Sequence, residues 1–372
     1  MEKRHRIWGR CVVVFLVSAT ISIAQQPRTN EPDTPIDQKT KTEVVHHLVE
    51  DLREQYVFPE IAAKLAQVLT ENLDRGEYAS IHGAKEFADI LTREMREIAH
   101  DAHLQVSYTS EVPRIPPEKP GQLDPEMLRR IKDENFGFKK VEILDGNVGY
   151  LKVSAFANAE MAGKTAAAAI AFLANTQALI IDLRENHGGN PGMVALLASY
   201  FFSGDQLVHL NDLSIKQPGS TEYAVQQSWT LPYVPGDRYL DKELYILTSH
   251  QTPSAAEAFA YDLKVLKRAT IVGEETWGGA NPGKTALLSD HLLAFIPFGR
   301  ASNPVTNTNW EGTGVLPDIK TPAADAVKTA YIAALGHLIQ KSTDERERKT
   351  LNQFIQNVDE NLRQGKPSLD SQ

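Results

Sequence analysis

This chain has almost no cysteine: Cys11 is the only one among its 372 residues. A single thiol forms no disulfide within the chain and cannot assemble a cysteine-ligated metal site. Cys11 also lies inside an N-terminal segment that we expect to be cleaved off, so no thiol nucleophile would remain afterwards. The folded protein must therefore rely on its packed core for stability.

Basic residues are fewer than acidic ones: the chain has 39 lysines and arginines and 48 aspartates and glutamates, which gives a net charge of -9. The composition offers no basic patch of the kind that phosphate backbones require, which excludes nucleic acid as a partner. Hydrophobic residues make up 42% and charged residues 23%, as in ordinary soluble globular proteins. The length allows two domains, or one large core with a smaller one attached.

Long apolar runs are missing except near the N-terminus, where residues 11–23 are largely apolar. A basic stretch with Lys3, Arg4 and Arg6 precedes this run, and the small residues Ser22 and Ala24 close it. The run is shorter than the roughly 20 residues that a membrane-spanning helix needs. We therefore predict a cleaved signal peptide at 1–24, a periplasmic or extracellular location, and no stable membrane insertion afterwards. The alternative is an uncleaved membrane anchor.

Composition and periodicity divide the rest of the chain into segments. Val44, Leu48 and Leu52 recur at helical spacing, and two later sets up to residue 98 do the same, which predicts a unit of three helices. A strand is expected to follow at 104–108, and prolines gather after it. We predict a linker at 25–40, an N-terminal helical domain at 41–110, a proline-rich linker at 111–139, an α/β catalytic domain at 140–342 and a C-terminal helix at 343–372.

From about residue 140 the pattern alternates between strands and helices. The run ALIIDL at 178–183 is continuously apolar, which is typical of a strand buried on both faces. We predict strands at 141–144, 148–153, 178–183, 244–248 and 270–272, and helices at 157–175, 191–203 and 254–267. This order predicts an α/β fold with a mostly parallel sheet.

Ser254 lies at the predicted junction between the strand 244–248 and the next helix. The first N–H groups of a helix have no intrahelical acceptor, and together with the helix dipole they favour a developing negative charge. The position therefore suits a nucleophile. On position alone an ordinary N-cap is the favoured role, because serine caps are common, so Ser254 needs partners before catalysis can be assigned to it.

A second turn carries Gly188 and Gly189 between a buried strand and a helix. Glycine serves where the backbone needs a positive φ or a close approach to a ligand, so this turn can aim an N–H at an oxyanion. The alternative is a tight turn without a ligand. The three-glycine spacing of a dinucleotide fingerprint is missing.

Together these two segments resemble the tail-specific (C-terminal processing) serine peptidase family, which includes tricorn-like peptidases and the repeat module of interphotoreceptor retinoid-binding protein. The resemblance rests on Ile181-Asp182-Leu183-Arg184 with Gly188-Gly189, and on Ser254-Ala255-Ala256-Glu257 followed by Arg268-Ala269 and Val272-Gly273-Glu274. It implies a crotonase-like (ClpP/crotonase) α/β core, an extracytoplasmic location and Ser254 as nucleophile. It also implies an oxyanion hole from the backbone N–H groups of Gly188 and Ala255, without a metal or another cofactor.

The chain departs from the processing peptidases at the position of their lysine base, 25 residues after the serine, where it has Gly279. The segment between 109 and 140 also leaves no room for their inserted PDZ domain. A serine without a base is inert, so a base must come from elsewhere. His103 is the best candidate, because histidine exchanges protons near neutrality and the tricorn-like branch places its catalytic histidine at this kind of position. The alternatives are a surface or helix-terminal histidine, and a metal ligand together with His100, although the sequence offers no evident third and fourth ligand.

Glu311 resembles the acidic position of the same branch, where it would orient the imidazole and stabilise its charged form. In tricorn-like enzymes that link passes through a serine before the histidine, and here the residue is Ala102. The alternative for Glu311 is a solvated loop carboxylate. These residues predict a serine peptidase that acts on peptides or proteins through an acyl-enzyme. The rival functions are an esterase with the same serine, and a binding module whose lipophilic ligand contacts Phe295, Ile296 and Phe298.

Overall fold

The computed structural model of the chain describes residues 33–112, 125–217 and 220–363. The predicted signal peptide at 1–24, with Cys11, lies outside the described residues, as do most of the first linker and the end of the predicted C-terminal segment. Within the described ranges, no helix combines the length and the apolar character that crossing a membrane requires.

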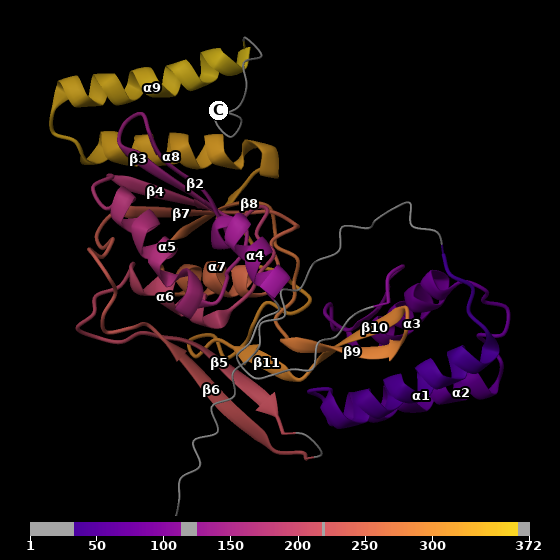
Figure 1. Cartoon of the computed structure of the whole chain (residues 1–372). Coiled ribbons are helices and arrows are strands. Elements are labelled where there is room, and N and C mark those ends of the chain that lie inside the picture. The colour runs from indigo at the N-terminus through magenta and orange to yellow at the C-terminus, as the bar shows by residue number, and fades with distance from the viewer. Residues whose placement is uncertain (1–32, 113–124, 218–219, 364–372) are drawn as a thin grey trace, which may run out of the picture.

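A six-stranded sheet with the order β12-β8-β7-β4-β3-β2 forms the centre of the molecule (Figure 1). Its strands are β2 (Phe138–Leu144), β3 (Val148–Val153), β4 (Ala178–Asp182), β7 (Glu243–Thr248), β8 (Thr270–Gly273) and β12 (Ile319–Lys320). Only β2, at one edge, runs antiparallel to its neighbour. Every residue of β4 is buried, as its apolar run predicts, and the predicted mostly parallel sheet is confirmed.

Helices cover both faces of this sheet (Figure 1). One face carries α5 (Ala159–Leu173), α6 (Pro191–Ser199) and α7 (Ala255–Val265). The other carries α8 (Ala326–Lys341) and α9 (Glu345–Arg363), preceded by a short 3-10 turn, η2 (Ala323–Asp325). A hydrophobic core fills each side of the sheet, so the strand ends before α6 and α7 are held between two packed layers.

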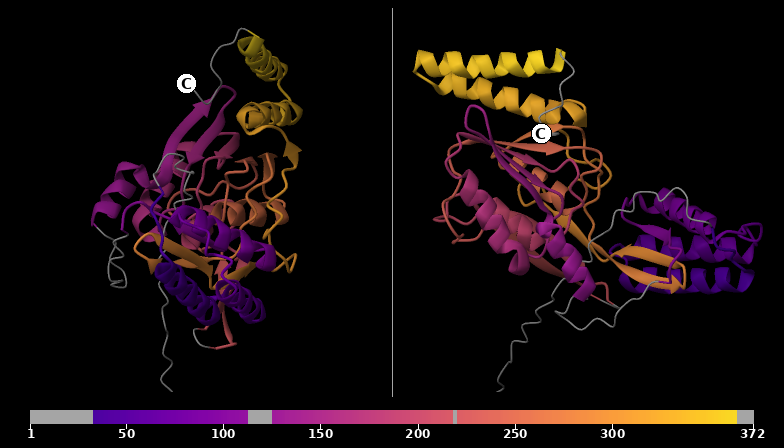
Figure 2. Two further views of the ribbon diagram at one scale, coloured as in Figure 1. Left: turned by 90° about the vertical axis from the view of Figure 1, so that its right-hand side faces the viewer. Right: turned by 45° about the horizontal axis from the view of Figure 1, so that its top comes forward.

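The N-terminal unit contains the three predicted helices and also a small sheet. The helices are α1 (Gln38–Gln55), α2 (Pro59–Asp74) and α3 (Ala84–Ala99), and the sheet has the order β1-β10-β9, from β1 (Gln105–Tyr108), β9 (Gly283–Ser289) and β10 (Leu292–Pro297). Leu288, Leu292 and Ile296 are buried in the same core as the helices. Figure 2 shows this hairpin reaching from the central domain into the helical unit. A hairpin far away in the sequence therefore completes the core that the three helices begin.

Both predicted linkers are shorter in the structure than in the sequence analysis. Asp37 caps α1 through a hydrogen bond from the Thr40 N–H (2.8 Å), so residues 38–40 are helical. In the proline-rich segment, α4 (Pro125–Asp133) and the 3-10 turn η1 (Asn135–Gly137) lead directly into β2. Proline is tolerated in the first turn of a helix, so Pro125 begins α4 instead of marking a linker.

A third sheet joins the two domains. It has the order β11-β5-β6 and consists of β5 (His209–Lys216), β6 (Tyr223–Trp229) and β11 (Gly299–Ser302). The buried ammonium of Lys216 donates to the carbonyls of Arg53 (3.1 Å) and Glu54 (2.8 Å) at the end of α1, where carbonyls lack intrahelical donors. This contact ties β5 to the N-terminal unit.

Asp262 of α7 is a buried carboxyl in the central domain. Its Oδ1 accepts a hydrogen bond from Asn303 (3.0 Å), and its Oδ2 has no partner among the described residues. Burial raises the pKa of Asp262 to about 8, although the asparagine bonds oppose the shift. The folded protein therefore holds a proton here that the unfolded chain releases near pH 4.

We expect the contribution of Asp262 to the free energy of unfolding to fall between about pH 4 and pH 8, because this group binds a proton in the folded state and not in the unfolded state in this window. Asp262 contributes at most about 1.4 kcal/mol per pH unit to that slope. Asp262→Asn removes the contribution, so urea unfolding at pH 5 and pH 8 should show the variant gaining stability relative to the wild type as pH rises. Parallel curves for the two proteins would contradict this assignment.

Candidate active site

Ser254 precedes α7 in a strained backbone conformation, with φ 56° and ψ −121°. Residues other than glycine rarely adopt such angles, and they persist only where surrounding contacts impose them. The side chain is half-buried, and the N–H of Ala255 is the first of α7. Ser254 thus lies beside an N–H that has no acceptor within the helix.

Glu257, one turn into α7, imposes this conformation. Its fully buried carboxylate accepts four hydrogen bonds. The donors are the N–H of Ser254 (2.7 Å), the N–H of Gly278 (2.7 Å), the N–H of Gly279 (2.9 Å) and the hydroxyl of Thr276 (2.5 Å). Burial raises the pKa of Glu257 to about 7, and the four donors oppose that shift. Glu257 therefore joins the candidate nucleophile to the loop at 276–279.

The turn with Gly188 packs directly against Ser254. A Cβ added to Gly188, which has φ 80°, would lie 3.1 Å from both the Cβ of Ser254 and the carbonyl oxygen of Pro253. The hydroxyl of Thr252 also bonds the carbonyl of Leu183 (2.8 Å), which ties the two strand ends together. The N–H of Gly188 donates to Oδ1 of Asn186 (2.8 Å), so it must exchange this bond before it can serve an oxyanion.

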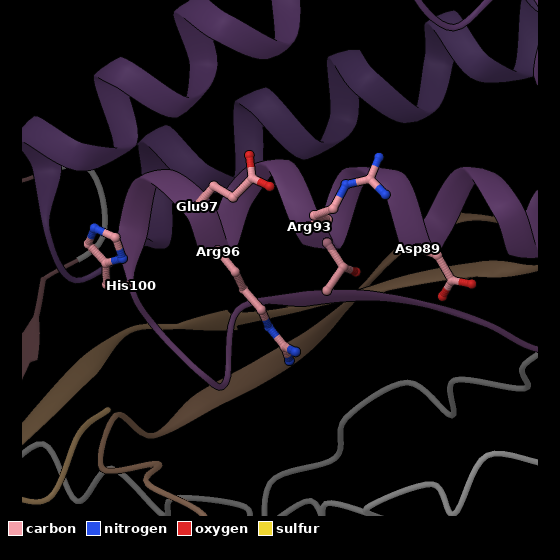
Figure 3. A pocket seen from close by; sticks show the side chains of 6 residues that line it. Asp89, Arg93, Arg96, Glu97 and His100 are labelled. Carbon is pink, nitrogen blue, oxygen red and sulfur yellow. The ribbon is translucent and has the colours of Figure 1, made fainter. Parts of the chain in front are cut away.

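His103 follows α3 in a loop whose backbone is fixed by two side chains. Arg96 points from α3 toward this loop and borders a surface pocket on the helix (Figure 3). Its guanidinium donates to the carbonyls of Ala102 (2.6 Å) and Leu104 (3.1 Å), on either side of His103. Asp101 accepts from the His103 N–H (3.0 Å), the Tyr56 hydroxyl (3.1 Å) and the Asn281 amide (3.0 Å). Histidine placement therefore depends on Arg96 and Asp101.

The His103 ring is 7% exposed and lies between two aromatic side chains. The centroid of its ring is 4.9 Å from that of Trp277, edge-on, and 5.7 Å from that of Phe295. Burial, with a smaller contribution from the Arg96 charge, lowers the pKa of His103 to about 4. The imidazole is therefore neutral at physiological pH and can accept a proton.

Glu311 lies beside this loop, as the sequence predicts, but it reaches the loop through the backbone. Its Oε1 accepts from the N–H of Ala102 (2.9 Å), and its Oε2 accepts from the N–H groups of Ala280 (2.6 Å) and Asn281 (3.1 Å). Burial, with the neighbouring Asp101 charge, raises the pKa of Glu311 to about 7. A serine at 102 is therefore unnecessary for contact between Glu311 and the histidine loop.

Gly279 connects the serine half of the site to the histidine half. Its N–H shares the Glu257 Oε2 with the N–H of Ser254, and its carbonyl accepts from the indole of Trp310 (2.9 Å). A Cβ on Gly279 would come within 3.0 Å of the His103 ring. No direct hydrogen bond between Ser254 and His103 is found among the described residues. Catalytic hydrogen bonds are often long without substrate and tighten when it binds.

The structure thus brings Gly188 together with Ser254 and Ala255, and His103 together with Glu311, and Gly279 lies between the two groups. Sequence analysis did not assign a role to Asp101 or Glu257, although Ser-x-x-Glu before an apolar run is the signature of a helix N-terminal capping box. The side chains predicted to contact a lipophilic ligand are Phe295, Ile296 and Phe298. Ile296 is fully buried in the N-terminal core, and Phe295 packs against His103, so these side chains do not form one open apolar pocket.

In comparisons with known proteins, both domains match family models. Residues 147–321 match the model of peptidase family S41, and residues 38–145 match the N-terminal domain of this family in eukaryotic IRBP. A chloroplastic carboxyl-terminal-processing peptidase 2 of Arabidopsis thaliana is 27% identical over 177 residues, which are 47% of this chain and 32% of the relative. A CtpA-like serine protease of Staphylococcus epidermidis is 27% identical over 262 residues, which are 63% of this chain and 50% of the relative.

The chain thus spans half or less of the length of these curated relatives. Among solved structures, a peptidase candidate from Parabacteroides merdae shares the fold, with a TM-score of 0.53 and 18% identity over 80% of this chain and 96% of the other. From the two family models, which together run from residue 38 to residue 321, we conclude that the chain belongs to peptidase family S41, a family of serine peptidases, and carries an IRBP-like N-terminal domain.

Proposed function

We propose that this chain is an exported serine peptidase that hydrolyses peptide bonds through an acyl-enzyme on Ser254. His103 is the general base, Glu311 supports the histidine, and the N–H groups of Ala255 and Gly188 form the oxyanion hole. The proposal includes a crotonase-like core for the central sheet and its helices, by analogy with the family. Peptides or proteins are the expected substrates.

The observation that carries this proposal is the conformation of Ser254. An N-cap serine needs no positive φ, because capping residues ordinarily adopt extended backbone angles. Here the chain holds φ at 56° with a buried carboxylate and packs a glycine turn against the residue. Such stored strain is typical of sites where a side chain must be presented to a ligand.

The proposed chemistry follows from these positions. Ser254 Oγ bonds to the substrate carbonyl carbon as its proton passes to Nε2 of His103. The oxyanion accepts from the Ala255 N–H, and from the Gly188 N–H once that group leaves Asn186. His103 then returns the proton to the leaving amine. Water attacks the acyl carbon next and gives a proton to His103, and His103 passes this proton to Ser254 Oγ as the bond between Oγ and the acyl carbon breaks.

A fluorophosphonate probe tests the proposal, because it labels activated serines covalently. We expect mass spectrometry to locate the label on Ser254 of the wild type, and both Ser254→Ala and His103→Ala to lose labelling and peptide hydrolysis by about a thousandfold or more. Ser249→Ala, at a buried serine of the preceding loop, controls for loss of fold. A folded wild type without label would contradict the proposal, and a labelled enzyme that cleaves esters but no peptides would assign it to esterases.

Export is a separate part of the proposal, supported by the basic and apolar pattern of residues 1–24. The intact mass of the protein secreted by an expressing host tests it. We expect a mature N-terminus at Gln25. A mass that retains residues 1–24 would indicate an uncleaved anchor instead.

A further inference from the structure

Three side chains that could ligate a metal ion meet where the histidine loop lies against Glu311. Asp101, His103 and Glu311 each offer one nitrogen or oxygen atom, and these atoms all lie within 4.8 Å of one another. Asp101 and His103 are 2% and 7% exposed, and Glu311 is half-buried. Two carboxylates and an imidazole in one buried cluster make a donor set that metal ions bind.

One buried nitrogen of this cluster lacks a hydrogen-bond partner in the described structure. The Nδ1 atom of His103 is buried and has no hydrogen-bond partner among the described residues. Carboxylate oxygens of Asp101 and Glu311 lie within 4.8 Å of each other, so two acids are held close together. A divalent cation at this place would give Nδ1 a partner and offset the repulsion between the two carboxylates.

The carboxylates keep free capacity for such an ion. Asp101 Oδ1 accepts from the His103 N–H, and Glu311 Oε1 accepts from the Ala102 N–H. Each carboxylate oxygen has two lone pairs, so a metal bond can be added without breaking these contacts. The backbone bonds would hold the two acids in place, as outer-shell hydrogen bonds do in known metal sites.

We propose that Asp101, His103 and Glu311 form an inhibitory site for a zinc ion, which binds Nδ1 of His103 and one oxygen from each acid. Imidazole nitrogen combined with carboxylate oxygen favours zinc over magnesium or calcium, which prefer oxygen ligands. Water would occupy the fourth position.

The inhibitory effect rests on the proposed function of His103 as the base. Binding of zinc through Nδ1 requires the neutral tautomer that carries its proton on Nε2, so Nε2 can no longer accept the proton of Ser254. Any proton on Glu311 passes to solvent when the ion binds. Zinc should therefore slow reaction of Ser254 with the fluorophosphonate probe, and a chelator should restore it.

Calorimetric titration of the tag-free full chain with zinc chloride tests the site without reference to activity. We expect one ion per chain, and at least about tenfold weaker binding in Glu311→Gln and in His103→Gln. His187→Ala, at an exposed histidine, is the matched control and should bind like the wild type. Circular dichroism checks that each variant is folded.

The zinc titration and the labelling rate of Ser254 test the site and its inhibitory role separately. No zinc binding by the folded wild type, or unchanged binding in both site variants, would overturn the proposed site. Site-specific binding that leaves the labelling rate of Ser254 unchanged would overturn the inhibitory role. If the wild type is never labelled, the peptidase proposal fails, but the titration still decides whether the zinc site exists.

Discussion

Gly279→Ala is expected to slow fluorophosphonate labelling of Ser254 by about a hundredfold, because a displacement of roughly 1 Å in a catalytic group has an effect of that size. A Cβ at this position would come within 3.0 Å of both the His103 ring and the Trp277 ring. Trp277 is 41% exposed, so its ring can move outward. His103 is buried, so relief of the clash on that side would displace its ring from the present position.

The backbone at Gly279 cannot shift to relieve this clash. Its N–H is held by Glu257 and its carbonyl by Trp310, so the new methyl group must displace the histidine. Overpacking of this kind costs about 1–3 kcal/mol of stability. We therefore expect a modestly destabilised, folded protein with a poorly placed base.

Gly336→Ala is the matched control, because it makes the same substitution inside α8 at a position with no atom within 4 Å of the new Cβ. Helix propensity predicts equal or slightly higher stability there. Labelling rates and urea unfolding of the two variants are to be measured in parallel. A Gly279→Ala protein that labels within about threefold of the wild type would show that His103 is not placed by this contact.

The close contact between Gly279 and His103 also bears on which residue can serve as the base for Ser254. In the resemblance to the processing peptidases, the position of their lysine base corresponds to Gly279 of this chain. A lysine here would begin at the Cβ that clashes with His103, so the two bases compete for one space. This accounts for a glycine at 279 in a chain whose base candidate comes from the N-terminal unit.

Much of the central domain could be predicted from the sequence. The apolar run at 178–183 and the strand before Ser254 predict a buried parallel sheet, because strands buried on both faces lack alternation. In the N-terminal unit, the spacing of Val44, Leu48 and Leu52 predicts α1, because apolar residues four positions apart lie on one face of a helix. These signals are local, and the structure has the elements where the signals place them.

The features that could not be predicted from the sequence depend on contacts between segments that are far apart in the chain. The hairpin of β9 and β10 pairs with β1, some 180 residues earlier, and local periodicity does not reveal such a partner. Glu311 reaches the histidine loop across a similar separation in the sequence, through the backbone N–H of Ala102, a group that every residue type except proline supplies. The four donors to Glu257 are also mostly backbone groups, so residue identity at 278 and 279 gives no sign of them.

Glu257→Gln is expected to lower both stability and serine reactivity. Glutamine has one acceptor oxygen and an amide that donates, so one of the two positions now occupied by carboxylate oxygens would present N–H groups to N–H donors. A buried donor without an acceptor costs about 1–3 kcal/mol, and more when the lost partner was charged. We expect at least 3 kcal/mol of lost stability, on the order of the loss on breaking a buried charged network.

The loss of reactivity should exceed what the loss of stability explains. Without the bond to Glu257, the N–H of Ser254 no longer fixes the strained φ, and the loop at 276–279 is released from the helix. Both the nucleophile and the contact that places His103 then relax. We expect labelling to fall by about a hundredfold or more at temperatures where the variant is still folded.

Glu60→Gln is the control, because it removes the charge of an exposed glutamate in the first turn of α2. Labelling rates are to be compared at a temperature where circular dichroism shows all proteins folded. A Glu257→Gln protein that is less stable but labels at the wild-type rate would restrict Glu257 to a structural role. A slow, folded variant would instead show that this carboxylate holds the reactive conformation of Ser254.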